Sequence, residues 1–104
     1  MVNVKYAPCG ISCNPDHIEK GEKIHLLYEG ILAKDGADRV FAHLGYGPAT
    51  KWSYINSFEM EPIGDKRFEV QFTAAGKGNL NVTFRDSAEH WDNNSGSNYV
   101  FEGR

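Results

Sequence analysis

The stretch VFAHLGY, residues 40–46, indicates the fold class because its side chains alternate in character along the chain. Its even-numbered positions hold Val, Ala, Leu and Tyr, whereas Phe41 and His43 occupy two of the positions between them. Successive side chains of a β-strand point to opposite faces of the sheet, so this alternation is typical of a half-buried strand. We therefore expect a strand whose even-numbered side chains enter a core and whose Phe41 and His43 lie on the opposite face.

The same period of two recurs on both sides of this stretch, and turn residues separate the segments that carry it. It is found in VNVKY (2–6), KIHLLY (23–28), RFEVQFT (67–73), NLNVTF (79–84) and NYVF (98–101), and more weakly in SYINSFEM (53–60). The helix candidate, residues 31–39, is short and contains Gly36. Six or seven short strands without a convincing helix predict an all-β fold, an antiparallel β-sandwich.

A chain of 104 residues has the length of one domain, so we expect a single module over residues 1–104. Residues 21–104 carry most of the alternating segments and are expected to form the sandwich. Residues 1–20 contain Pro8 and Pro15, and we expect them to form an irregular N-terminal arm.

The charge and hydropathy patterns exclude two classes of partner. The 11 Lys and Arg residues are scattered among 14 Asp and Glu residues, which gives a net charge of −3. A nucleic-acid-binding domain needs a basic surface, so we expect no nucleic acid. The sequence has no apolar run of about 20 residues, so we expect no membrane span. The first residues have no apolar core of a signal peptide, which leaves open a domain excised from a longer secreted protein.

Cys9 and Cys13 form a C-x-x-x-C pair that permits three interpretations. They close a small disulfide loop in an oxidising compartment, they remain free thiols, or they bind a metal together with His17. A structural zinc site needs four ligands, usually at tighter spacing. We therefore expect no metal and no cofactor, and the choice between disulfide and free thiols stays open.

Two tryptophans stand in polar surroundings that are unusual for core residues. Trp91 lies in DSAEHWDNNSGSN, residues 86–98, which lacks strand patterning, and Trp52 follows a turn after Pro48. Sugar rings stack their C–H faces on aromatic side chains, and their hydroxyls need polar groups at the edge. The alternative interpretations are a core or lid role for each tryptophan and turn-capping roles for the asparagines. From the residues alone, the sequence predicts a β-sandwich with a candidate aromatic binding surface.

Two segments of the sequence resemble family 25 carbohydrate-binding modules, which occur in bacterial amylolytic enzymes and related secreted proteins. They are GILAKDGADRVFAHLGYGPATKW (30–52) and LNVTFRDSAEHWDNNSGSNY (80–99), and the resemblance extends over residues 21–101. It implies an immunoglobulin-like β-sandwich that has no catalytic activity and binds starch, amylose and malto-oligosaccharides. It also implies a monomeric module that is attached to a larger extracellular enzyme such as an amylase.

In that family one histidine and two tryptophans form the sugar platform. The matching residues here are His43, Trp52 and Trp91, and Asn93 and Asn94 match the polar edge of the motif. The N-terminal 20 residues, including both cysteines, have no counterpart in the family pattern.

Two other functions remain as alternatives. A glycosidase needs two carboxylates about 5–10 Å apart, one of them with a raised pKa. Asp86, Glu89 and Asp92 lie near His90, but nothing in this hydrophilic segment predicts the burial that would raise a carboxyl pKa. A protein-binding sandwich of a secreted multidomain protein would instead cover its aromatic patch with a partner.

Overall fold

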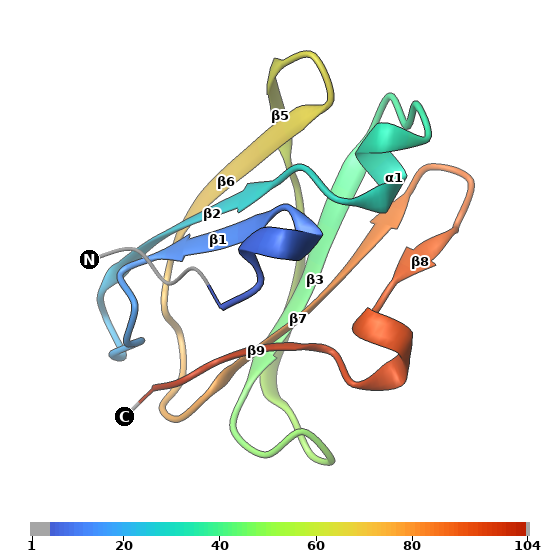
Figure 1. The fold of residues 1–104 in the computed structure, drawn as a ribbon. Coiled ribbons are helices and arrows are strands. Elements are labelled where there is room, and N and C mark those ends of the chain that lie inside the picture. Colours follow the sequence, from blue (N-terminus) through green and yellow to red (C-terminus); the bar gives the residue numbers. More distant parts are fainter. Residues whose placement is uncertain (1–4, 104) are drawn as a thin grey trace.

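The computed structural model describes residues 5–103 and consists of two antiparallel sheets packed face to face (Figure 1). The first sheet has the strand order β1-β2-β6-β5, and the second has the order β4-β3-β7-β8, with β9 also pairing with β7. The strands are β1 (Ile11–Asn14), β2 (Lys23–Tyr28), β3 (Val40–Tyr46), β4 (Ser53–Glu59), β5 (Glu61–Gly64), β6 (Arg67–Thr73), β7 (Leu80–Asp86), β8 (Trp91–Asp92) and β9 (Tyr99–Phe101). Helical structure is limited to single turns: η1 (Ala7–Cys9), α1 (Ile31–Lys34) and η2 (Asn94–Gly96).

This strand order is that of an immunoglobulin-like sandwich. Strands β1, β2, β6 and β5 take the places of A, B, E and D, and β3 and β7 take those of C and F. Strand β4 adds to the edge of the second sheet beside β3, as C′ does in variable-type domains. The prediction of an all-β, antiparallel sandwich is confirmed.

The core lies between the sheets and includes most of the side chains that the alternation predicted. The even-numbered residues of β3 are at most 1% exposed, and those of β2 and of β7 from Leu80 to Phe84 are fully buried. Tyr28 of β2 stacks on Phe84 of β7 with ring centroids 4.2 Å apart, which joins the two sheets. Burying each such side chain stabilises the fold by about 1.5–3 kcal/mol.

The prediction of an irregular arm over residues 1–20 is wrong at its centre. Residues Ile11–Asn14 form β1, which pairs with β2 in register from Ile11 opposite Tyr28 to Asn14 opposite His25. Two inward side chains in a short strand are too weak a pattern to predict it, but Ile11 and Cys13 are each only 1% exposed. The strand expected at residues 2–6 falls mostly on residues outside the described range.

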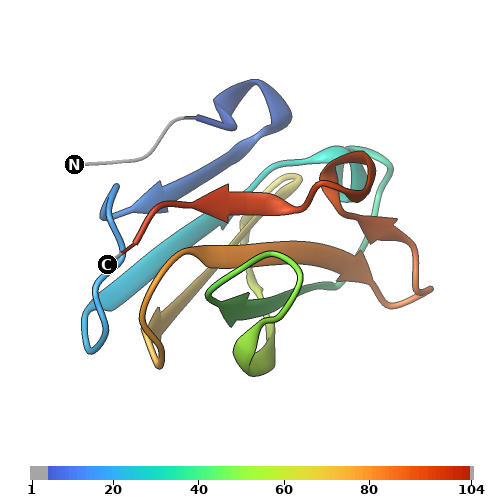
Figure 2. The same cartoon turned by 90° about the horizontal axis from the view of Figure 1, so that it is seen from below.

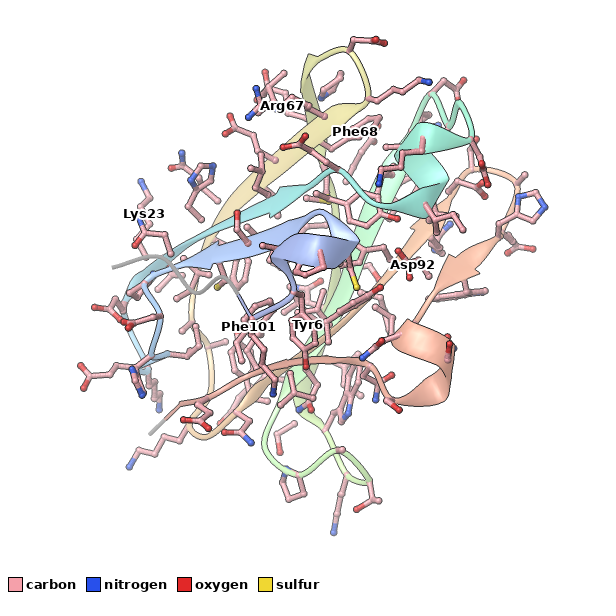
Figure 3. All side chains as sticks on the ribbon, in the orientation of Figure 1. Tyr6, Lys23, Arg67, Phe68, Asp92 and Phe101 are labelled. Atoms are coloured by element: carbon pink, nitrogen blue, oxygen red, sulfur yellow. The ribbon has the colours of Figure 1, made fainter. Side chains whose placement is uncertain are left out.

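The described end of the arm also packs on the sandwich. The ring of Tyr6 meets those of Tyr99 and Phe101 edge to face, with centroids 5.0 and 5.5 Å apart. Figure 3 shows Tyr6 beside Phe101, and Figure 2 shows β9 between β1 and β7. The Tyr6 hydroxyl accepts a hydrogen bond from the Val100 amide at 3.0 Å. The arm therefore covers the open side of β9.

Both cysteines are free thiols, so the disulfide interpretation does not hold in this structure. Cys13 points into the core from β1, and burial raises the pKa of its thiol to about 12. Cys9 is exposed in η1. Within residues 5–103, no cluster of three or more His, Cys, Asp or Glu side chains could hold a metal ion. In the same part of the chain, no helix is long and apolar enough to cross a membrane.

Candidate functional site

Three aromatic rings meet on the outer face of the second sheet. His43 lies in β3, Trp52 lies in the loop before β4, and Trp91 lies in β8. The ring centroid of His43 is 6.0 Å from that of Trp52 and 6.0 Å from that of Trp91. The structure thus brings together three of the five residues that the sequence predicted for a sugar site.

The two tryptophans present faces of different orientation. The imidazole plane of His43 makes an angle of 34° with the Trp52 ring and 82° with the Trp91 ring. The two indole planes therefore differ by at least 48°, the difference between those angles. Trp91 is 50% exposed, and Trp52 and His43 are half-buried. The surface is a bent aromatic platform that is open to solvent.

His43 is held in one orientation by its neighbour across the strand pair. Ser57 of β4 is the register partner of His43, and its hydroxyl lies 2.7 Å from His43 Nδ1. No other described residue hydrogen-bonds to the imidazole, so Nε2 is left for a ligand hydroxyl. Because Ser57 Oγ can donate or accept, His43 can offer Nε2 as an acceptor or as a donor.

Trp52 rests directly on the sheet because β3 has no side chain at the position beneath it. A Cβ atom added to Gly45 would lie 2.8 Å from both Cβ and Cε3 of Trp52, and 3.2 Å from Cγ1 of Ile55. The indole Nε1 donates to the carbonyl of Ala49 at 3.0 Å, which fixes the ring within its own loop. A glycine at position 45 is therefore required for the observed position of the Trp52 side chain.

A β-bulge in β4 turns this part of the strand toward the platform. Tyr46 pairs with Ser53 and Leu44 pairs with Asn56, so two residues of β4 lie opposite Gly45 alone. The first of the two, Tyr54, has φ of +53°, a conformation that costs about 1–3 kcal/mol in a residue other than glycine. Ile55 lies on the outer face with Ser57, next to Gly45, and is 56% exposed.

Asn81 of β7 hydrogen-bonds to the loop that leads to Trp52. It is the register partner of Gly45 and is fully buried. Its side-chain amide donates to the carbonyl of Gly47 at 2.9 Å, and the amide of Gly47 donates to the carbonyl of Asn79 at 2.8 Å. These two bonds fix the start of the loop relative to the sheet.

Trp91 is placed by a two-residue strand that the sequence did not predict. Residues 86–98 were expected to lack strands, but Trp91 and Asp92 form β8 and pair with Arg85 and Phe84 of β7. Because successive side chains alternate, Trp91 lies on the outer face and Asp92 points inward. From this edge the indole reaches back across β7 to meet His43.

Asp92 anchors β8 through a buried hydrogen-bond network. Its Oδ2 accepts a bond from the hydroxyl of Tyr28 and its Oδ1 accepts one from that of Tyr99, each at 2.7 Å. Tyr28 Oη also accepts a bond from the amide of Leu32 at the start of α1, at 3.1 Å. Figure 3 shows Asp92 between β8 and α1. The network links the strand that carries Trp91 to both sheets.

Burial has a measurable consequence for the two tyrosines. Desolvation raises the pKa of Tyr28 and that of Tyr99 well above the ordinary value of 10.0. The hydrogen bonds to Asp92 act in the same direction, because the carboxylate accepts the phenolic protons in the neutral form. Both hydroxyls therefore remain protonated donors up to strongly alkaline pH.

Asn93 and Asn94 take part in the turn that follows β8. Asn93 Oδ1 accepts a hydrogen bond from the amide of Gly96 at 3.1 Å, which caps η2. Asn94 Nδ2 donates to the carbonyl of Asn98 at 2.9 Å. Each side chain retains one polar group without a hydrogen bond to a described residue. The structure thus gives both asparagines a role in the turn, and among the described residues no hydrogen bond joins either of them to the three rings.

Asp86, at the start of the segment 86–98, is also part of a turn. Asp86 accepts hydrogen bonds from the amides of Ala88 and His90 at 3.0 and 2.8 Å, and lies 3.0 Å from His90 Nδ1. The hydrogen bond from the His90 amide is the largest of the effects that lower the pKa of Asp86. A lowered pKa does not suit a general acid, which needs a raised one.

Residues missed by the sequence interpretation complete the site. Gly45 leaves room for Trp52, Ser57 hydrogen-bonds to His43, and Asp92 anchors the strand that carries Trp91. The motif around Trp91 contains Asp92, but only the pairing of β8 with β7 shows that the Asp92 side chain points inward.

Comparisons of the chain with protein-family models, with curated proteins and with solved structures found no match.

Proposed function

We propose that the chain is a non-catalytic module that binds α-1,4-glucans such as starch, amylose and malto-oligosaccharides on the platform of His43, Trp52 and Trp91. The observation that carries this proposal is the angle of at least 48° between the two indole planes, each of which meets His43. An α-1,4-glucan is a curved chain and suits platforms set at an angle, whereas a flat β-1,4-glucan suits rings in one plane.

The polar groups at the platform support the same ligand. His43 Nε2 and the open edges of the rings leave room for hydroxyls in the plane of a stacked sugar. The exposure of Trp91 favours a ligand that covers the ring only when bound.

The affinity for a single chain should be modest, with a dissociation constant on the order of 10⁻⁵ to 10⁻³ M. Few rings stack, and the surface is open to water. Attachment to a secreted amylolytic enzyme would then raise the effective concentration of the module at the polysaccharide. This role in targeting an enzyme is part of the proposal.

Isothermal titration with maltoheptaose and cellohexaose, side by side, tests the ligand class. We expect heat of binding with maltoheptaose and none with cellohexaose at matched concentrations. Equal binding of both sugars, or binding of cellohexaose alone, would contradict the proposal. Binding of neither sugar would favour the protein-binding alternative for the same aromatic surface.

A further inference from the structure

Arg85 lies on the outer face of the second sheet beside the platform. It is the register partner of Phe41 on one side and of Trp91 on the other, so the three side chains share a face and a row. The guanidinium carbon lies 4.3 Å from the centroid of the Phe41 ring. Phe41 in turn precedes His43 by two positions in β3, so the two side chains lie on the same face.

The neighbouring Arg39 provides a contrast within the same structure. Its guanidinium also approaches the Phe41 ring, at 5.2 Å, but it donates two hydrogen bonds to Glu59 at 2.9 and 3.0 Å. The Arg85 guanidinium makes no hydrogen bond or ion pair with any residue from 5 to 103. Of the two guanidiniums on Phe41, that of Arg85 therefore has all its donors available, whereas Arg39 directs two of its donors to Glu59.

The contact with Phe41 prepares these donors for a ligand. A guanidinium attracted to an aromatic face loses part of its freedom of motion, and its N–H groups form a rigid planar fork. Less conformational freedom is then lost when it binds. Sugar hydroxyls accept hydrogen bonds, and the row of Phe41, Arg85 and Trp91 continues the platform away from Trp52.

We propose that Arg85 is a direct ligand-contact residue, which donates hydrogen bonds to hydroxyls of an α-glucan where the chain passes beyond Trp91 and His43 toward Phe41. This inference rests on the proposed function and adds to it a preference for chain length. Arg85 lies one side-chain row beyond His43, because His43 pairs with Thr83 and Phe41 pairs with Arg85. We expect a short oligosaccharide stacked on Trp52 and His43 to end before this row, whereas a longer one reaches it.

Titration of the wild type, Arg85→Ala and Arg39→Ala with maltotriose and with maltoheptaose tests the inference. We expect Arg85→Ala to lose affinity for maltoheptaose by on the order of tenfold, and to bind maltotriose within about twofold of the wild type. Arg39→Ala removes the other cation from the same ring and should bind both sugars within about twofold. Arg85→Lys keeps the charge but lacks the planar fork, and should lose most of the same affinity.

The outcomes separate this inference from the proposed function. Wild-type affinity for maltoheptaose in Arg85→Ala and in Arg85→Lys would overturn the role of Arg85 and leave the platform in place. An equal loss in Arg39→Ala would also overturn it, because support of Phe41 and not the free donors would then be responsible. An equal loss with maltotriose would overturn the chain-length preference. Absence of binding by the wild type would overturn both proposals. Urea midpoints of each variant show that the proteins compared are folded.

Discussion

Replacing the hydroxyl of Tyr28 should destabilise the fold more than replacing that of Tyr99. In Tyr28→Phe, Asp92 Oδ2 loses its donor and the amide of Leu32 loses its acceptor. In Tyr99→Phe, only Asp92 Oδ1 loses a donor. Both rings keep their places in the core, so the comparison isolates the hydrogen bonds.

The magnitudes follow from the partners. A hydrogen bond to a charged group contributes about 1.5–3 kcal/mol, and a buried amide left without a partner costs about 1–3 kcal/mol. We therefore expect the free energy of unfolding to fall by about 1.5–3 kcal/mol in Tyr99→Phe. In Tyr28→Phe it should fall by about 2.5–6 kcal/mol, because both losses occur together.

Urea denaturation at pH 7 measures these differences. A loss in Tyr99→Phe as large as that in Tyr28→Phe, or changes below about 0.5 kcal/mol in both, would refute the assigned network.

The dependence of stability on alkaline pH gives a second, independent measurement. Between pH 10 and the raised folded-state pKa, the folded protein keeps each phenolic proton and the unfolded chain releases it. Stability should therefore fall as pH rises above 10, by up to about 1.4 kcal/mol per pH unit for each tyrosine. Each phenylalanine variant should fall less steeply, and an unchanged slope would contradict the burial of the hydroxyl.

Three further predictions concern the platform and the arm. Gly45→Ala should displace Trp52, weaken maltoheptaose binding severalfold and cost about 1–3 kcal/mol of stability; wild-type tryptophan fluorescence and wild-type affinity would contradict the tight contact. Tyr54→Gly should be more stable than Tyr54→Ala by about 1 kcal/mol in urea melts, because φ is positive at this position; the reverse order would show that the bulge is not strained. Cys13→Ser should cost about 1–3 kcal/mol through a buried hydroxyl, whereas Cys9→Ser should change stability by less than about 0.5 kcal/mol. Neither cysteine variant should change the affinity for maltoheptaose, and a loss of binding in folded protein would place the arm in the site.

The sequence predicted the fold well because most strands bury one face completely. The period of two in residues 40–46 and 80–84 is fixed by core packing, and the structure has the expected side chains inside. Strand β1 escaped prediction because it has only two inward residues, of which one is Cys13. The bulge at Tyr54 and Ile55 was not predicted, because alternation alone does not reveal an inserted residue.

The site could be predicted only in part. His43, Trp52 and Trp91 were identified from polar context and resemblance, and the structure places their rings together. Asn93 and Asn94 have short polar side chains that serve a turn as readily as a ligand, and local sequence does not separate these roles. The contact of Gly45 with Trp52 depends on the bulged pairing of β3 with β4, and that of Arg85 with Phe41 depends on the pairing of β3 with β7, so no local pattern reveals them.

Titration of Trp91→Ala with maltoheptaose shows whether the exposed platform binds α-glucan. Trp91 is 50% exposed at the sheet edge, so its removal should change the free energy of unfolding by less than about 1 kcal/mol. Loss of a stacking ring should nevertheless weaken binding by at least tenfold, a change of about 1.4 kcal/mol or more. We predict a variant with a nearly wild-type urea midpoint and little affinity for maltoheptaose. A folded variant that binds maltoheptaose as the wild type does would contradict the account.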